Sequence, residues 1–479
     1  MARPRISLLA PAEVERIQGT SLRILAEVGV HVPHVGALER LAGAGAEVER
    51  GRAIARLPER VVLDAVAAAG KRYVLHGRTP GQVARYGYGE CNLMSTPGQF
   101  AWFEARTGQR RDPTLADARA AITLGDALPN VTVVGAMAVP LDVPTPIRDV
   151  VATAELVRGT GKPTRTWPVN RASTELVLAI YEAVAGGSAA LRERPMVETF
   201  LEPISPLRFP ETGLDVMIPF IERGQPVSVG PMVMASGTGP ATLAGTLAQE
   251  NAEILAGIAI VQAFAPGHPM MYGGIPHVMD PRTSTCSFGS PEQGLMALAM
   301  AQIGQAYGLP VYVNVNLTDA KRLDVQAGLE KAASRILAIV GGADQVGHGG
   351  IVGADHGAAL DWLVVDDEAL GFVKRIARGF EVDDETLAYD VIAAVGSSGD
   401  FLAEDHTVTH FRRELFLPSP RWTRQPYDTW NAGGAMTMGE RAQERVEEVL
   451  GNHLVPPLDE ALDREVEAIV ATARRTLLD

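Results

Sequence analysis

Short apolar segments alternate with longer amphipathic segments through the middle of this chain. Each apolar segment is rich in Val, Met or Tyr, and a loop with Gly, Pro and polar residues follows it. The segments that come next, such as residues 247–264 and 326–340, repeat apolar residues at helical spacing. The apolar segments lie at residues 99–103, 131–138, 163–168, 196–202, 226–232, 269–275, 310–316 and 343–349. This pattern predicts eight consecutive strand–helix units.

Eight strand–helix units are the number found in a (β/α)8 barrel. The alternative is a doubly wound open sheet, which has fewer strands and often a G-x-G-x-x-G turn after the first. No such turn follows any of the eight segments. We therefore favour an α/β fold, a (β/α)8 TIM barrel over residues 95–380. Residues 1–94 and 381–479 are predicted to be helical extensions that pack on the barrel, because neither has the composition of a linker.

Side-chain alternation predicts which strand residues face the barrel interior. In residues 310–316 the three valines suit the helix side, which places Tyr312, Asn314 and Asn316 inward. The same alternation turns Glu198, Phe200, Glu202, Ser228, Gly230 and Met232 inward, and Arg165 and Trp167 share a face. Deep polar groups of this kind either hydrogen-bond one another or serve a site. For Glu202, Asn316 and the loop after it we favour function, because active sites of this fold lie at the carboxyl ends of the strands.

The composition excludes several classes of partner. Apolar residues make up 46% of the chain, which predicts a large core, and the net charge of −14 argues against nucleic acid or an anionic membrane. Two cysteines, Cys91 and Cys286, do not make a disulfide framework. No segment approaches about 18 consecutive apolar residues, and the first residues lack the apolar stretch of a signal peptide. We expect a soluble, cytoplasmic protein.

Metal and anion sites have weak support in the sequence. Neither cysteine has the spacing of a zinc ligand. His406 and His410 are spaced i, i+4, but they lack the Glu of a zinc protease motif and follow the barrel units. We therefore expect no metal. The glycine-rich turns at residues 236–241 and 346–350 offer backbone N–H groups to a phosphate or a carboxylate, or they are simply tight turns.

Several aromatic residues fall at or near the predicted strand ends. They are Trp102, Trp167, Phe200, Tyr272 and Tyr312. A quaternary ammonium ion has no N–H to donate, so aromatic faces and diffuse negative charge hold it. Ordinary core packing is the alternative for each ring alone.

Three segments resemble the trimethylamine methyltransferase superfamily: residues 317–331, 401–418 and 427–450. Residues 205–209 and 272–280 look similar as well. The resemblance runs from near the N-terminus to the end of the chain. It implies a TIM barrel and an enzyme that moves a methyl group from a methylamine or quaternary amine to Co(I). That cobalt belongs to a corrinoid (cobalamin) carried by a separate small protein.

The founding members of that family use pyrrolysine, which this sequence lacks. The resemblance is therefore to the branch without pyrrolysine, for which glycine betaine and related quaternary amines are the known type of substrate. When its methyl carbon is attacked, a quaternary nitrogen leaves as a neutral tertiary amine and needs no proton. A tertiary amine would leave as an anion unless it were first protonated or captured. The protein then has to supply proximity, orientation and exclusion of water.

The predicted substrate site follows from the strand ends and the resemblance together. Its residues are Trp167, Glu202, Tyr272, His277, Tyr312, Asn314, Asn316 and His348. A betaine carboxylate needs donors, for which His348, Asn316, Lys321, Arg282 and His277 are candidates.

The polar loop after residue 316 has two interpretations. Asp319, Lys321 and Asp324 shape the pocket or the surface that receives the corrinoid protein, or they form a salt-bridged loop that anchors the helix starting near Val325. We expect a homo-oligomer. The alternative function is a barrel enzyme or non-catalytic binder for another small amine or a phosphorylated metabolite.

Overall fold

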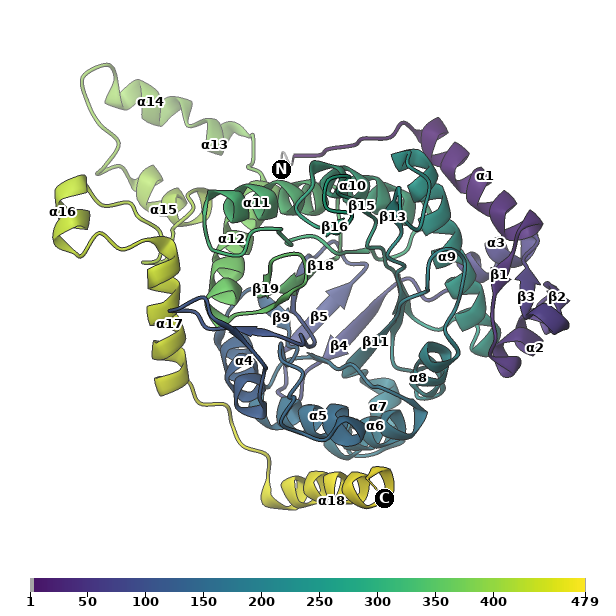
Figure 1. The fold of residues 1–479 in the computed structure, drawn as a ribbon. Helices are drawn as coiled ribbons and strands as arrows, with labels where there is room; N and C mark the ends of the chain where they lie inside the picture. The colour runs from purple at the N-terminus through teal and green to yellow at the C-terminus, as the bar shows by residue number, and fades with distance from the viewer. Residues whose placement is uncertain (1–3, 479) are drawn as a thin grey trace.

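Eight short parallel strands form two four-stranded sheets at the centre of the molecule (Figure 1). The computed structural model describes residues 4–478. The strand orders are β17-β18-β6-β9 and β10-β11-β12-β14. Isolated parallel bridges, Val134 to Thr164 and Tyr272 to Val311, join the edges of the two sheets. The strands are β6 (Asn92–Ser95), β9 (Val131–Val133), β10 (Thr164–Arg165), β11 (Val197–Leu201), β12 (Val227–Val229), β14 (Met270–Tyr272), β17 (Tyr312–Val313) and β18 (Gln345–Gly349).

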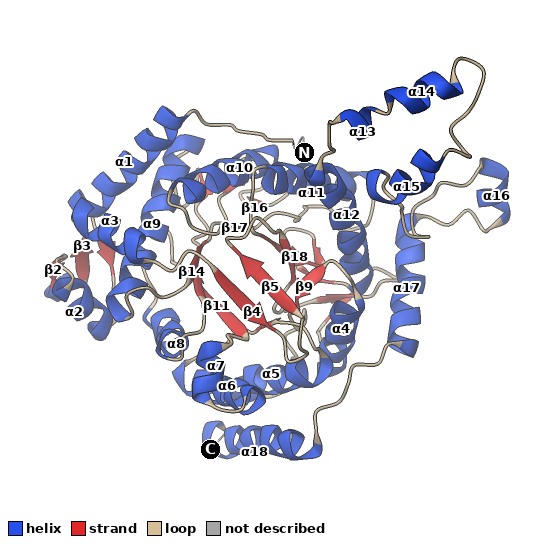
Figure 2. Cartoon of the chain, turned by 180° about the vertical axis from the view of Figure 1, so that it is seen from behind, coloured by secondary structure: helices blue, strands red, loops and turns tan. Residues whose placement is uncertain are grey.

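A helix follows each of these strands and covers the outside of the sheets (Figure 2). Polar side chains fix several helix starts by accepting a backbone N–H, as Thr114 does for the first of these helices and Asn170 for the third. The predicted helices at residues 247–264 and 326–340 are confirmed. The helices are α4 (Leu115–Ala127), α5 (Arg148–Gly159), α6 (Arg171–Ala185), α8 (Glu211–Glu222), α9 (Leu243–Phe264), α10 (Pro291–Ala306), α11 (Val325–Val340) and α12 (Leu360–Arg378), with the short α7 (Ser188–Glu193) after α6.

The first central strand is not the one predicted from the sequence. The prediction placed it at residues 99–103, but β6 at Asn92–Ser95 pairs with both β18 and β9. Trp102 and Phe103 instead form β7 of a small sheet with β8 (Arg110–Arg111), β19 (Ile351–Val352) and β20 (Gly357–Ala358). The apolar alternation of residues 99–103 serves this loop sheet. The true strand is short and carries two polar residues, so its pattern is weak. Each of the other seven predicted segments contains a central strand.

The N-terminal segment contains strands as well as the predicted helices. Its helices pack on α9, which explains why almost all of that helix is buried. A β-hairpin of β4 and β5 lies across the amino-terminal end of the central strands, where Tyr73, Leu75 and Tyr86 pack with Met94 and Met271. The elements are α1 (Pro11–Glu27), β1 (Val30–His31), α2 (Val35–Gly43), β2 (Glu47–Glu49), β3 (Ile54–Arg56), α3 (Glu59–Ala68), β4 (Tyr73–His76) and β5 (Val83–Tyr86).

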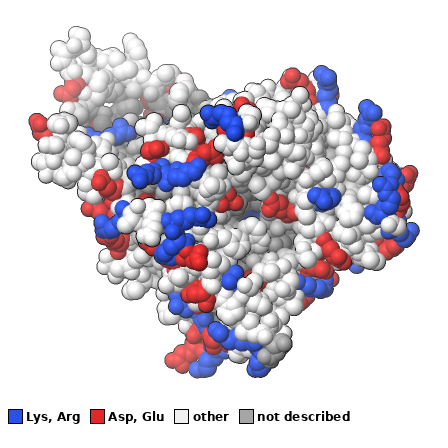
Figure 3. Space-filling view, viewed as in Figure 1, with Lys and Arg blue, Asp and Glu red and all other residues white. Residues whose placement is uncertain are grey.

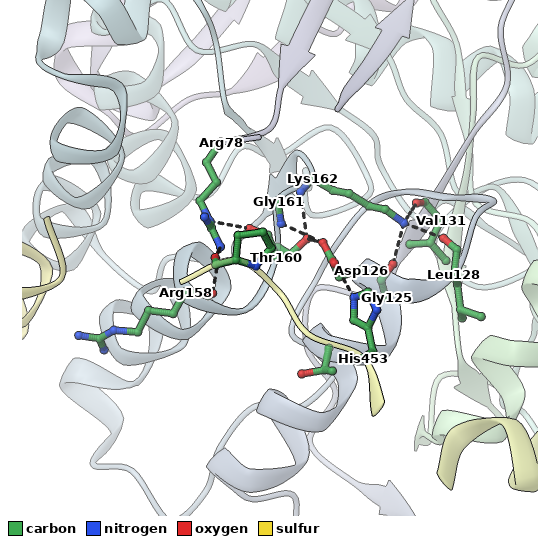
Figure 4. Close-up of polar contacts among 12 residues, drawn as sticks. Arg78, Gly125, Asp126, Leu128, Val131, Arg158, Thr160, Gly161, Lys162 and His453 are labelled. Atoms are coloured by element: carbon green, nitrogen blue, oxygen red, sulfur yellow. Dashed lines mark hydrogen bonds and ion pairs between the residues drawn. The ribbon is translucent and has the colours of Figure 1, made fainter. Parts of the chain in front are cut away.

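The C-terminal segment is helical, and its two longest helices pack on the body. Helix α17 (Met438–Asn452) contacts α12 and α4, and α18 (Glu460–Leu477) contacts α5 and α6. The connection between them is tied down beneath α4, where His453 Nε2 lies 2.8 Å from Asp126 Oδ2 and Arg78 donates to the carbonyl of Pro456 (Figure 4). Asp126 also accepts from the hydroxyl of Thr160. Helices α13 (Asp384–Leu387), α14 (Tyr389–Val395), α15 (Asp405–Glu414) and α16 (Tyr427–Ala432) project from the body (Figure 1).

Among residues 4–478, no helix combines the length and the apolar character that a membrane crossing requires.

Candidate active site

A cavity of about 280 Å³ lies at the carboxyl ends of the central strands. In Figure 3 the face that carries these ends is hollowed near its middle, and acidic atoms lie beside the hollow. The lining residues come from the ends of β10, β11, β17 and β18 and from the loops that follow the strands. They include Thr96, Gln99, Arg165, Thr166, Trp167, Phe200, Glu202, Met232, Ile275, Phe288, Asn314, His348 and Asp355.

A buried ion pair forms the floor of this cavity. Arg165 Nη1 donates to Glu198 Oε1 at 2.7 Å, and both residues are almost fully buried. Glu198 also accepts from the hydroxyl of Tyr73 at 3.2 Å and from Gln345 Nε2 at 3.4 Å. The guanidinium carbon of Arg165 lies 5.2 Å from the centre of the Phe200 ring. Glu198 therefore faces inward as predicted, and the deepest polar groups bind one another.

Two carboxyl groups stand above this floor. Glu202 follows directly after β11, and no hydrogen bond to its carboxylate occurs among the residues that the structure describes. Burial raises the pKa of Glu202 to about 7, and the negative charge of Asp355 adds to this increase. Enclosure in the cavity wall raises the pKa of Asp355 to about 6, although Gln99 Nε2 donates to it at 2.7 Å. Because a nearby cation stabilises carboxylates, the cavity is suited to a positively charged ligand.

A neutral histidine and several rings complete the wall. Burial lowers the pKa of His348 to about 3, and the nearby Arg165 contributes to this. His348 Nε2 lies 3.4 Å from the hydroxyl of Tyr312, whose ring packs edge-on against Phe200 with centroids 5.6 Å apart. At pH 7 His348 is therefore uncharged and offers one N–H donor and one acceptor.

The structure brings four of the eight predicted substrate residues to the cavity: Trp167, Glu202, Asn314 and His348. Tyr312 lies behind two cavity residues and supports them. His277 is buried, stacks on the lining residue Phe288 and places its Nδ1 2.9 Å from the carbonyl oxygen of Ile275.

Tyr272 and Asn316 do not line the cavity. Tyr272 faces the helices, where its hydroxyl donates to Asn251 of α9 at 2.9 Å and its ring meets Gly304 of α10. The structure therefore places the Tyr272 side chain among the helices and outside the cavity. Asn316 is fully buried with φ of 73°, in the left-handed region, and neither amide atom has a hydrogen-bond partner in the described part of the chain.

The three predicted loop residues also lie outside the cavity lining. Asp319 accepts from the hydroxyl of Ser287 and from the backbone N–H of Phe288. Lys321 Nζ donates to the carbonyl of Asp319, and Asp324 caps the start of α11. The loop thus anchors α11 as the structural interpretation expected, but through hydrogen bonds, because the ion pairs found in residues 4–478 do not include these side chains.

Gln99 and Asp355 are among the cavity residues that the predicted site did not contain. They lie in the loops after the first and last central strands, which are neighbours because β6 pairs with β18. The position of Asp355 after the last predicted strand was a signal for this end of the barrel, whereas the misplaced first strand hid the position of Gln99.

No group of three or more His, Cys, Asp or Glu residues in the described chain is placed to hold a metal ion. The rings of His406 and His410 are tilted by 36° with centroids 4.3 Å apart, and His410 Nε2 lies 3.3 Å from Glu385.

Comparisons with known proteins match nearly the whole length of this chain and point to one group of methyltransferases. A family model described as trimethylamine methyltransferase matches residues 1–477. A glycine betaine methyltransferase of Desulfitobacterium hafniense (strain Y51) is 32% identical over 98% of this chain and 97% of its own. A trimethylamine methyltransferase of D. hafniense (strain DSM 10664 / DCB-2) is 31% identical over 96% and 92%. The crystal structure of the Methanosarcina barkeri monomethylamine methyltransferase has a similar fold, with a TM-score of 0.57, 12% identity, and coverage of 92% and 88%.

Proposed function

Because this chain belongs to the trimethylamine methyltransferase family, we propose that it takes a methyl group from a quaternary amine, glycine betaine or a close relative. The acceptor in this proposal is the Co(I) of a corrinoid carried by a separate small protein. The chain is a methyltransferase of this family, and the substrate and the carrier are our proposal. The observation that carries it is the cavity with Glu202 and Asp355, which favours a small cation.

We also infer that the eight central strands close into a (β/α)8 barrel. Parallel bridges link both pairs of sheet edges, and every strand is followed by a helix. The barrel then begins at β6 and ends with α12, with the N- and C-terminal segments packed around it. In such a barrel the active site lies at the carboxyl ends of the strands, which is where the cavity lies.

The size of the cavity suits the amine and not the carrier's cofactor. Drug-sized ligands occupy pockets of roughly 300–1,000 Å³, so a cavity of about 280 Å³ fits a small molecule. The corrinoid would have to approach from the hollowed face, and when bound there it supplies the nucleophile for the methyl carbon. The chain's own residues bind and orient the amine and exclude water.

Each part of the amine has a matching group in the wall. Glu202 and Asp355 supply negative charge to the ammonium, and Trp167 and Phe200 supply aromatic faces. A betaine carboxylate would accept from His348 or from Arg165, whose guanidinium reaches the cavity beside Glu198. No proton transfer is required, because a quaternary nitrogen leaves as a neutral amine.

A methyl-transfer assay tests the proposal. The purified chain is mixed with a reduced corrinoid protein and a panel of glycine betaine, carnitine, tetramethylammonium and trimethylamine. We expect the visible spectrum of the corrinoid to change with a quaternary amine and the demethylated amine to accumulate. Glu202→Gln should slow the reaction, whereas Asp280→Asn, at an exposed turn, is the matched control. Turnover of trimethylamine alone would refute the substrate assignment, and binding without any transfer would favour the non-catalytic alternative.

The cellular location is also a proposal. We propose that the protein acts in the cytoplasm, which the two free cysteines, Cys91 and Cys286, support because a reducing compartment keeps thiols free.

A further inference from the structure

Two carboxyl groups on α9 bind the loops that build the cavity. Glu250 and Glu253 lie about one turn apart on this helix, which packs on β12 from outside the sheet (Figure 1), and both are fully buried. Glu253 accepts from the backbone N–H of Leu207 at 2.9 Å and from the hydroxyl of Ser205 at 2.7 Å. It therefore fixes the loop that follows β11 and Glu202.

Glu250 connects the loops after the neighbouring strands β12 and β14. Its Oε2 accepts the backbone N–H of Val233 at 3.1 Å, and its Oε1 accepts that of Ile275 at 2.9 Å. The nitrogen of Ile275 also lies 3.0 Å from the carbonyl oxygen of Pro231, whereas the N–H of Val233 has no other acceptor among residues 4–478. The Val233 N–H therefore depends on Glu250 alone.

The close approach of the second loop to α9 requires a glycine. A Cβ atom at Gly274 would lie 3.2 Å from Glu250 Oε1 and 2.3 Å from the terminal methyl of Met300. The two loops also bind each other, since the backbone N–H of His277 donates to the carbonyl of Val233 at 3.1 Å. The carboxylate, the glycine and this backbone bond together define one position for both loops.

The carboxyl of Glu250 is costly to bury. Burial raises its pKa well above the ordinary value of a glutamic acid, and the negative charges of Glu253 and Glu202 add to this increase. An ionisable group in the interior lowers stability unless it is paired or hydrogen-bonded. Its two backbone hydrogen bonds offset part of that cost, and they go to the loops that carry Met232 and Ile275 of the cavity wall. The cost and the bonding partners together indicate a role in shaping the site.

We infer that Glu250 is a positioning residue for the methyl transfer, holding Met232 and Ile275 in the cavity wall through the peptide groups beside them. The inference rests on the proposed function. In that function the charges of Glu202 and Asp355 and the aromatic faces bind the cation, and none of them lies on these two loops. The loops instead shape the apolar wall, which orients the methyl carbon for attack. Displacing them should therefore lower kcat more than it lowers affinity.

Two variants of the full chain separate the position of the carboxyl from its charge. Glu250→Asp keeps the charge but withdraws the oxygens by about 1.5 Å, the length of one carbon–carbon bond. Glu250→Gln loses the charge but keeps an oxygen within reach of the Val233 N–H. We expect kcat to fall at least about tenfold in Glu250→Asp and to stay within about threefold of the wild type in Glu250→Gln. The dissociation constant for tetramethylammonium should change by less than about threefold in both.

Asp344 provides the matched control. This buried carboxyl precedes β18 at the amino-terminal end of the strands, and it also accepts two backbone N–H groups, from Val311 at 2.9 Å and from Gly87 at 2.8 Å. Asp344→Glu changes the length of the side chain by the same one carbon but should leave kcat unchanged. Circular dichroism checks that each variant is folded. A loss of kcat in Asp344→Glu as large as in Glu250→Asp would overturn the inference, because the effect would then be general destabilisation.

Hydrogen–deuterium exchange provides a second measurement that needs no substrate. The amide of Val233 should exchange at least about tenfold faster in Glu250→Asp than in the wild type, and at close to the wild-type rate in Glu250→Gln. Unchanged exchange at Val233 in Glu250→Asp, full kcat in that variant, or a larger loss in Glu250→Gln would overturn the inference. A wild type that demethylates no amine would refute the proposed function, and exchange at Val233 would then decide the role of Glu250.

Discussion

Binding of a quaternary amine should depend on pH, because Glu202 changes charge within the measurable range. Burial raises the pKa of this carboxyl to about 7. If the cation binds the ionised form, the apparent dissociation constant is multiplied by one plus the ratio of protonated to ionised carboxyl. That factor is about 11 at pH 6 and about 1.1 at pH 8. The Glu202 carboxylate should therefore contribute an about tenfold rise in affinity between these pH values. Glu202→Gln should remove this part and leave the about twofold rise that Asp355, with a pKa of about 6, contributes.

Isothermal titration calorimetry with tetramethylammonium isolates the effect, because this ligand has no titratable group. Buffers with different ionisation enthalpies report proton release, which should approach half a proton at pH 7 for the wild type. The control Asp280→Asn should keep the full pH dependence. An affinity that is constant from pH 6 to pH 8, or an equally large pH dependence in Glu202→Gln and the wild type, would refute the proposal that this carboxylate contacts the cation.

Three further predictions concern single residues. Trp167→Ala should weaken binding of a quaternary amine by about 2- to 5-fold, the loss of one aromatic contact to a cation at a ring that is 58% exposed, as measured by the same titration. His348→Ala should weaken glycine betaine more than tetramethylammonium, and equal losses would count against His348 as the carboxylate donor. The folded state holds the proton of Glu202 more tightly than the unfolded chain does, so stability falls as pH rises from about 4.5 to about 7. Glu202→Gln should therefore raise the melting temperature at pH 8 and leave it unchanged near pH 4, and an equal shift at both would contradict this.

The fold was predictable where apolar and polar residues alternate regularly over the full length of a strand or helix. Residues 310–316 alternate over enough positions to give both the strand and its inward face, which placed Asn314 correctly. Strand β6, Asn92–Ser95, has four residues with mixed polarity, and its identity depends on pairing with strands far away in the sequence. The hairpin of β4 and β5 was not predicted, because its side chains pack against residues distant in the sequence, such as Met94 and Met271, and the local sequence pattern does not show this packing.

The site was predictable only in part, for a related reason. Trp167, Glu202 and His348 stand at strand ends that the sequence locates well, and all three line the cavity. Tyr272 also stands at a strand end. Its side chain faces the helices, because the face that a side chain takes depends on the pairing register of the strand, and a shift of one residue turns it to the opposite face. Asp355 becomes part of the cavity through a positive φ of 64° and a hydrogen bond to Gln99, contacts between loops that no local pattern contains.

The hairpin of β4 and β5 has a kinetic consequence. Its side chains fill the amino-terminal end of the central strands, and the hydroxyl of Tyr73 reaches the floor at Glu198. The cavity therefore opens toward the opposite end, which is the face that we propose receives the carrier protein. The amine then enters, and the demethylated amine leaves, through the same opening that the docked carrier covers. The reaction should follow an ordered sequence in which the amine enters first and its product leaves last, and excess carrier should slow turnover by occupying the opening of the empty enzyme.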